Sequence, residues 1–184
     1  MAILKVARLG HPVLRRVADP VPVRDIARGE TQRFIDDMVE TMREYEGVGL
    51  AAPQVHVSRQ IAVVRVQSHP RYPDMSPIPL TVIVNPVLTP VGEETNADWE
   101  GCLSIPDFRG VTPRYTTVRL EAQDRHGERI ELVAKDFFAR VLQHETDHLK
   151  GHVYLDRMEN LSTLSYLHEW ARHGGHPDPD EESD

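Results

Sequence analysis

The 184-residue sequence predicts an α+β domain in which antiparallel or mixed sheets pack around one central helix. Three observations predict this fold. Apolar residues recur at helical spacing in two segments, runs of alternating or β-branched residues lie between them, and the second helical segment carries the polar groups suited to chemistry. A chain of this length can bury one hydrophobic core without disulfides. We therefore expect one domain over residues 1–172 and an acidic, disordered tail over residues 173–184.

The first part of the chain is expected to hold an irregular arm followed by a helix. Three prolines interrupt residues 1–30, which favours turns over regular structure. The helix is predicted over residues 31–46, where apolar side chains recur on one face. Gly47 and Gly49 are expected to end it.

Five strands are predicted in the middle of the chain from alternating or β-branched runs. They are expected at residues 61–66, 81–85, 87–91, 115–122 and 129–134. A proline-rich loop at 69–79 separates the first two. The last two flank Asp-Arg-His-Gly at 124–127, which predicts a hairpin.

The central helix is predicted over residues 135–150. One face carries Phe137, Val141, His144 and His148, and the neighbouring face carries Phe138, Leu142, Glu145 and Leu149. Asp136 is expected to cap its start and Gly151 its end. A last amphipathic stretch at 161–171 precedes the acidic tail.

Charge and composition exclude several classes of protein. The formal net charge is −8, and a general nucleic-acid binder needs a basic face, so general nucleic-acid binding is not expected. No segment approaches the roughly 18 apolar residues of a membrane span, and the N-terminus lacks the features of a secretory signal. Cys102 is the single cysteine, which rules out an internal disulfide and fits a reducing compartment. We expect a cytoplasmic protein without a membrane partner.

The string Gln-His-Glu-Thr-Asp-His-Leu at 143–149 carries the clearest chemical signal. Four residues along an α-helix advance about 6 Å and rotate about 400°, so His144 and His148 lie nearly above one another. Two imidazoles placed in this way can chelate one cation, and Glu145 can reach a water on that cation. Ten histidines allow a chance pair at this spacing, but the intervening Glu on an apolar-striped helix favours a metal-dependent hydrolase.

A catalytic metal site of this type needs a third protein ligand. The position where one known pattern has a histidine holds Tyr154, and His152 is two residues short of it. Glu159 or Glu169 would fit another metallopeptidase arrangement. Cys102 would supply a thiolate from upstream, although a free cysteine is more often a small buried apolar residue. The residues alone leave these candidates open.

A third segment, Gly-Val-Gly-Leu-Ala-Ala-Pro-Gln at 47–54, follows the first predicted helix. Its glycines let a backbone approach closely, and Gln54 offers an amide donor. By itself such a segment is usually only the turn that follows a helix.

Taken together, the three segments resemble the peptide deformylase family. That family carries Gly-x-Gly-Leu-Ala-Ala-x-Gln, Glu-Gly-Cys-Leu-Ser and Gln-His-Glu-x-Asp-His-Leu-x-Gly in this order. They stand here at 47–54, 100–104 and 143–151 with no mismatch at the fixed positions. His-Pro-Val-Leu at 11–14 also resembles the family's opening, so the similarity runs from about residue 3 to about residue 157. The family's fold is α+β, with the metal helix among antiparallel sheets.

The resemblance implies the reaction and the metal. The reaction is hydrolysis of the N-formyl group from formyl-methionyl nascent peptides, which yields formate and a free amino terminus. Cys102, His144 and His148 would ligate the catalytic metal. This is Fe²⁺ in the family's usual native form and zinc, nickel or cobalt in others.

The resemblance also implies roles for residues beside the metal. Glu145 would be the general acid and base, moving a proton from water to the leaving amine. Gln54 and the backbone N–H of Leu103 would hold the developing oxyanion. The backbone around Val48 and Gly49 would pair with the extended substrate peptide. The methionine side chain would enter a pocket lined by Val48, Phe137, Val141 and His144.

The roles expected for three charged residues near these motifs are less definite. Glu100 and Asp147 are expected to anchor the metal ligands or the helix rather than to catalyse. Arg140 lies beside the predicted methionine pocket, and a turn of its side chain to solvent would leave that pocket apolar.

Two other functions compete with this prediction. One is a different metallopeptidase that uses His144, His148 and Glu169, with Cys102 structural. The other is a non-catalytic metal-binding or peptide-binding module, against which the intact Glu145 argues. One branch of the family docks on the ribosome through a basic C-terminal helix. Five acidic residues lie among the last seven here, which disfavours that contact.

Overall fold

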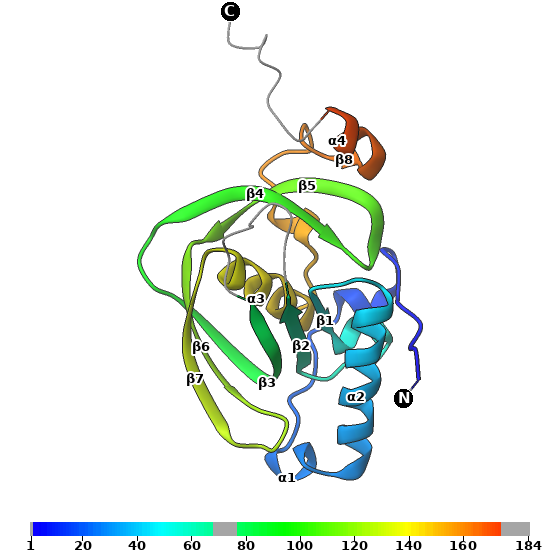
Figure 1. The fold of residues 1–184 in the computed structure, drawn as a ribbon, viewed down its shortest axis with the longest axis vertical. Coiled ribbons are helices and arrows are strands. Elements are labelled where there is room, and N and C mark those ends of the chain that lie inside the picture. The colour runs from blue at the N-terminus through cyan, green and yellow to red at the C-terminus, as the bar shows by residue number, and fades with distance from the viewer. Residues whose placement is uncertain (1, 68–76, 174–184) are drawn as a thin grey trace, which may run out of the picture.

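A computed structural model describes residues 2–67 and 77–173 and confirms the α+β class (Figure 1). The helices are α1 (Val23–Ile26), α2 (Gly29–Glu44), α3 (Asp136–Leu149) and α4 (Leu167–His173), with short 3-10 helices η1 (Pro12–Arg15), η2 (Ala52–Val55) and η3 (Tyr154–Arg157). The strands are β1 (Gly49–Ala51), β2 (Ile61–Val66), β3 (Ile78–Pro90), β4 (Thr95–Cys102), β5 (Ile105–Tyr115), β6 (Thr117–Gln123), β7 (Arg129–Lys135) and β8 (Ser165–Tyr166). None of the helices in these two ranges has the length and apolar character needed to cross a membrane.

The strands form two antiparallel sheets. The larger sheet has the order β1-β2-β3-β6-β7, and the smaller has the order β4-β5-β8. Helix α3 lies between them, under the long curved β4–β5 hairpin (Figure 1). The predicted hairpin at 115–134 is confirmed as β6 and β7, whose turn is closed by the Asp124 carboxylate accepting from the backbone of His126 and Glu128.

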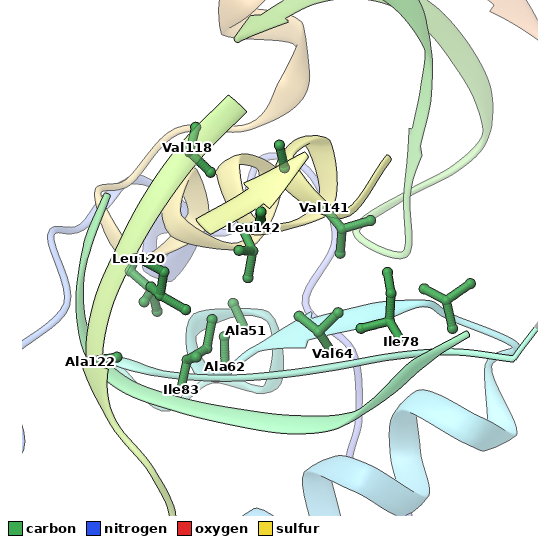
Figure 2. Packing of buried hydrophobic residues seen from close by; sticks show 14 of the residues in the cluster. Ala51, Ala62, Val64, Ile78, Ile83, Val118, Leu120, Ala122, Val141 and Leu142 are labelled. Atoms are coloured by element: carbon green, nitrogen blue, oxygen red, sulfur yellow. The ribbon is translucent and has the colours of Figure 1, made fainter. Parts of the chain in front are cut away.

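Both faces of the larger sheet are buried where β1, β2 and the first half of β3 form it. Val141 and Leu142 of α3 pack toward Val64 and Ile83 on one face (Figure 2). Helix α2 covers the other face, where Met38 lies in a second apolar cluster. The apolar stripes of both helices follow the 3.6-residue period, which explains why the two predicted helices form.

Strand β3 corrects the prediction of two separate strands at 81–85 and 87–91. The chain instead forms one long strand whose register shifts between Val84 and Val87. Asn85 lies at this shift with a left-handed φ of 51°, and its side-chain amide pairs with the backbone N–H and C=O of Val21 at 2.8 Å each. The amide therefore stabilises an irregularity that the sequence pattern shows only as a break.

The predicted helix ends are also corrected. Helix α2 ends at Glu44, and Glu46, not a glycine, takes the left-handed conformation. Gly49 belongs to β1. At the start of α3 the cap position is Lys135, and Asp136 makes no side-chain cap. Gly151 does end α3, with a φ of 78°.

Strands β4 and β5 were not predicted, because prolines, glycines and charged residues interrupt any alternation between residues 95 and 115. The predicted amphipathic stretch at 161–171 is a short strand, β8, followed by α4. Most of the predicted loop at 69–79 and all of the predicted tail except His173, which ends α4, lie outside the described residues.

An ion pair joins the N-terminal segment to the chain that follows α3. The Arg15 guanidinium donates to the Asp156 carboxylate, which also accepts from the backbone N–H of Val153 at 2.8 Å. Burial raises the pKa of Asp156, but these hydrogen bonds outweigh it and hold the pKa below its ordinary value. The ionised carboxylate therefore stabilises the folded state.

We predict that Asp156→Asn lowers the free energy of unfolding at neutral pH by up to about 1 kcal/mol, since the pair is partly exposed. A depressed folded-state pKa stabilises the protein above the unfolded pKa of about 3.9, and this contribution is lost as the pH falls through the folded-state value. The difference between the two proteins should therefore shrink between pH 5 and pH 3 in urea unfolding. A difference that stays constant over this range would contradict the prediction.

Candidate active site

All the predicted site residues except the fully buried His148 line one cavity of about 460 Å³. Most of its walls come from three places in the fold: the segment that joins α2 to η2, the end of β4 with its turn into β5, and one face of α3. The motifs that are far apart in the sequence are therefore brought together. The predicted site residues on its surface are Val48, Gly49, Gln54, Cys102, Leu103, Phe137, Val141, His144 and Glu145.

Cys102, His144 and His148 present a cluster of metal-ligating atoms. One sulfur and one ring nitrogen from each imidazole all lie within 4.8 Å of one another. The Cys102 Sγ lies 3.3 Å from the His148 Nε2. Within residues 2–67 and 77–173, no other set of three His, Cys, Asp or Glu side chains has this geometry.

The pKa shifts of this cluster favour a Cys102 thiolate and a protonated His144, so His144 would release its proton on binding a metal. Burial raises the pKa of Cys102, but the charge of His148 and hydrogen bonds from both histidines outweigh it and hold the pKa well below its ordinary value. The sulfur is then a thiolate, which is the form that binds metals. Burial lowers the pKa of His144, but hydrogen bonds to Cys102 and Glu100 hold it well above its ordinary value. A thiolate and two imidazoles are a donor set that zinc and Fe²⁺ both accept.

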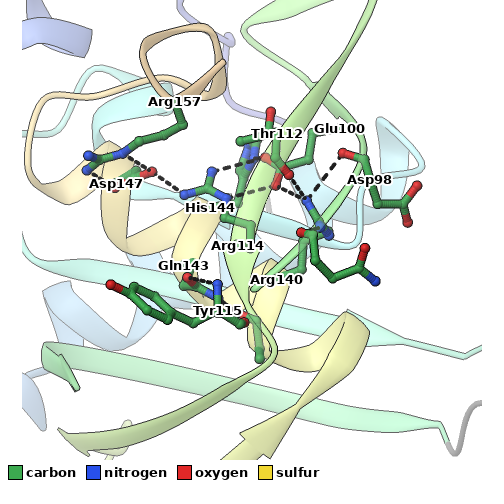
Figure 3. A network of polar contacts seen from close by, with 12 residues as sticks. Asp98, Glu100, Thr112, Arg114, Tyr115, Arg140, Gln143, His144, Asp147 and Arg157 are labelled. Atoms are coloured by element: carbon green, nitrogen blue, oxygen red, sulfur yellow. Dashed lines mark hydrogen bonds and ion pairs between the residues drawn. The ribbon is translucent and has the colours of Figure 1, made fainter. Parts of the chain in front are cut away.

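A buried carboxylate orients the His144 ring. Glu100 Oε2 lies 2.9 Å from the His144 Nδ1, which leaves Nε2 to face the cluster (Figure 3). Burial raises the pKa of Glu100, but the His144 hydrogen bond and the Arg114 charge bring it well below its ordinary value. Arg114 donates to both Glu100 oxygens, at 2.8 and 3.0 Å. The expected anchoring role of Glu100 thus has a direct geometric basis.

Arg140 does not turn to solvent. Its side chain is buried and donates to Glu100 Oε1 at 2.8 Å and to the backbone oxygens of Asn96, Asp98 and Thr112 at 2.6, 3.3 and 2.8 Å (Figure 3). These acceptors lie on β4 and β5. The guanidinium therefore joins α3 to the hairpin that carries Cys102.

Asp147 anchors the C-terminal end of α3, the helix that carries His144 and His148. Its carboxylate accepts from Arg114 and, through both oxygens, from Arg157 at 2.7 and 3.1 Å (Figure 3). Burial raises the pKa of Asp147, but these hydrogen bonds bring it below its ordinary value. Arg114 therefore bridges the carboxylates of Glu100 and Asp147.

Glu145 is buried beside the cluster, with 3% of its surface exposed. Burial raises its pKa to about 7. Its Oε2 is buried and has no hydrogen-bond partner among the described residues, and Glu145 lines the cavity. A Cβ added at Gly49 would collide with the Glu145 carboxylate, so only glycine lets β1 approach this group.

Gln54 and Leu103 lie on either side of Cys102. Gln54 Oε1 accepts from the Ala51 N–H at 2.8 Å, which turns Nε2 toward the Cys102 Sγ at 3.4 Å and the Ser104 Oγ at 3.3 Å. Leu103 lies in the turn between β4 and β5, where its carbonyl accepts from Arg8.

The competing metal ligands lie away from the cluster. Glu169 is on α4 and pairs with His168 at 2.9 Å, in an exposed position. His152 lies 3.9 Å from Asp156. Tyr154 stacks on the His144 ring, with centroids 6.4 Å apart.

Several residues of this region were missed by sequence reasoning, among them Arg114, Trp99 and Leu167. Arg114 looks like any charged strand residue until its buried partners are known. Trp99 and Leu167 line the cavity. Trp99 stands next to a motif residue and could have been noticed, whereas nothing local marks Leu167.

Known proteins resemble this chain throughout. The profile of the polypeptide deformylase family matches residues 3–163. Peptide deformylase 1 of Bordetella pertussis is 46% identical over 90% of this chain and 91% of its own length, and peptide deformylase 2 of Pseudomonas putida is 43% identical over 89% and 92%.

Solved structures agree with the sequence relatives. The class I type b peptide deformylase of Acinetobacter baumannii bound to Met-Ala-Ser superposes with a TM-score of 0.82 at 38% identity, covering 85% of this chain and 99% of that one. The peptide deformylase of Synechococcus elongatus in complex with actinonin has a TM-score of 0.77 at 32% identity, covering 95% and 87%.

Members of this family are metal-dependent hydrolases that remove the N-formyl group from the N-terminal methionine of newly made polypeptides. The three motifs, the cavity that unites them and the match over residues 3–163 lead to one assignment. The chain belongs to the polypeptide deformylase family.

Proposed function

We propose that this chain deformylates nascent peptides with Fe²⁺ held by Cys102, His144 and His148, and with Glu145 as the general acid and base. The observation that carries the proposal is the approach of a thiolate and two imidazoles beside a buried carboxylate. The resemblance implies iron as the usual ion, with zinc, nickel or cobalt as alternatives, and the donor set fits each of them.

The ion and Glu145 have separate tasks. A bound divalent ion supplies hydroxide at neutral pH by lowering the pKa of water from 15.7 toward about 7. Glu145 accepts the proton from that water and later delivers it to the leaving amine nitrogen. The Glu145 carboxylate packs against Gly49, which restricts it to one position. Its Oε2 has no hydrogen-bond partner among the described residues and is available to accept the proton.

Gln54 and the backbone N–H of Leu103 are proposed to hold the formyl oxygen as it gains negative charge. Both lie next to Cys102 on the cavity surface. The Ala51 N–H orients the Gln54 amide before substrate arrives, so little reorganisation accompanies the reaction.

The substrate peptide is proposed to pair with the backbone of Val48 and Gly49. β1 is the outer strand of the larger sheet and is paired on one side only, with β2. An extended peptide can therefore add to its other side. Val141 and Phe137, one and two turns before His144 on α3, are proposed to line the methionine pocket with Val48. Arg140 also lines this cavity, but its guanidinium donors are taken up by Glu100 and by backbone oxygens of β4 and β5.

The proposed place of action is the bacterial cytoplasm, where formylated nascent chains are made. Ribosome docking through the C-terminus is not part of the proposal, because the acidic residues there would be repelled by RNA. The net charge of −8 likewise does not support general nucleic-acid binding.

The function is tested on protein purified without oxygen. We expect formate release from formyl-Met-Ala peptides and about one iron per chain, because the cluster offers a single three-ligand site. Exposure to air should reduce the rate, since both Fe²⁺ and the Cys102 thiolate oxidise. Absence of formate release would contradict the function, and zinc in place of iron would contradict only the choice of ion.

We predict that Glu145→Gln lowers kcat by a factor of about 10² to 10⁴ while the metal content stays unchanged, because the variant removes the proton carrier and no ligand. Formate release and metal analysis on the same sample measure both quantities. The exposed Glu159→Gln is the matched control and should keep full activity. Near-normal turnover in the Glu145 variant would remove this residue from its proposed role.

The third ligand is tested with two further variants. Cys102→Ser should weaken metal binding by at least about tenfold, since even changes behind the ligands cost 10-fold to 100-fold. Glu169→Gln should bind metal like the wild type, because Glu169 lies on exposed α4. Competition with a chelator measures both affinities. Metal loss in the Glu169 variant instead would favour the other metallopeptidase arrangement.

A further inference from the structure

We propose that Leu167, the first residue of α4, is a specificity-determining residue that contacts one of the two substrate residues following formyl-methionine and favours an apolar side chain there. This inference rests on the proposed function. Leu167 is partly buried and lines the same cavity as Cys102 and Glu145. It therefore reaches the reaction site from a part of the chain that none of the three motifs includes.

Strand pairing determines where Leu167 lies. In the antiparallel pair of β5 and β8, Phe108 is opposite Tyr166 and Arg109 is opposite Ser165. Continuing this register brings Leu167 beside Asp107. Asp107 and Arg109 both line the cavity, so the β8–α4 junction forms part of its rim at the β5 edge.

Aromatic contacts hold this segment against the hairpin. The Phe108 and Tyr166 rings lie 4.5 Å apart, and the Trp99 and Trp170 rings lie 6.0 Å apart in an edge-to-face arrangement. The first pair joins β8 to β5, and the second joins α4 to β4. Trp99 itself lines the cavity, and Figure 1 shows β8 and α4 beside the β4–β5 hairpin that carries it.

The position of Leu167 suits a longer substrate. A cavity of about 460 Å³ falls in the range that accepts a whole drug-sized ligand, which exceeds one formyl-methionine. The proposed methionine pocket lies on α3, at Phe137 and Val141. Leu167 comes from a different element, α4, and lines the cavity together with the charged Asp107 and the aromatic Trp99. It offers apolar surface to a peptide residue that follows the methionine.

The part of the cavity wall that Leu167 forms belongs to the C-terminal segment and lies outside the region that the family profile matches. The family profile ends at residue 163, four residues before Leu167. The specificity of this chain beyond formyl-methionine is therefore expected to depend on a segment outside that match.

The test compares kcat/KM for four peptides: formyl-Met-Leu-Ser, formyl-Met-Asn-Ser, formyl-Met-Ser-Leu and formyl-Met-Ser-Asn. We expect the wild type to prefer leucine over asparagine at one of the two positions. Leu167→Ala should reduce that preference by a factor of about 10 or more, since even one methylene group in an apolar pocket is worth about tenfold. Leu167→Met should retain it.

Leu161→Ala is the matched control, because Leu161 belongs to the same segment but is 66% exposed and does not line the cavity. It should keep the wild-type preference. An unchanged preference in the Leu167→Ala protein, or an equal loss on all four peptides, would overturn the inference and leave the proposed function standing. A wild-type protein that releases no formate from any of the four would overturn the proposed function itself.

Discussion

The site depends on one buried carboxylate, Glu100, which joins the β4–β5 hairpin to helix α3. Glu100 accepts hydrogen bonds from His144, Arg114 and Arg140, and each of these side chains is itself buried or nearly so. Because Glu100 is two residues before Cys102, the same contacts that orient a histidine also place the thiolate. Removing one member would leave a charge buried without its partner, which typically costs 3 to 5 kcal/mol. The network therefore explains why so many charges lie in the interior.

Close backbone approach is the second constraint. Gly49 brings the edge strand against the Glu145 carboxylate, and a Cβ at Gly47 would lie 2.9 Å from the Leu103 side chain. The strand proposed to bind the peptide therefore lies directly against Glu145, which is proposed to move the proton. The residues just before that strand lie against Leu103, whose N–H is proposed to hold the oxyanion. The glycines of the first motif therefore allow this close contact and do not terminate α2. The residue that takes the left-handed conformation after α2 is Glu46.

The cavity combines walls of different origin. Its floor comes from α3 and the β4–β5 turn, where the family motifs lie, and part of its rim comes from the β8–α4 junction beyond the family match. Aromatic pairs join this junction to the hairpin. Loops and terminal segments on a rigid scaffold commonly carry specificity in this way.

The sequence by itself determined what depends on local geometry. The spacing of His144 and His148, the apolar stripes of α2 and α3, and the β6–β7 hairpin all follow from periods of 3.6 or 2 residues. Only the tertiary structure decided which third group joins the histidines, since Cys102 and Glu169 are equally acceptable from the residues alone and only Cys102 lies within reach. It also decided that Arg140 turns inward and that β4 and β5 are strands, because those outcomes depend on partners distant in sequence, and no local period encodes a distant partner.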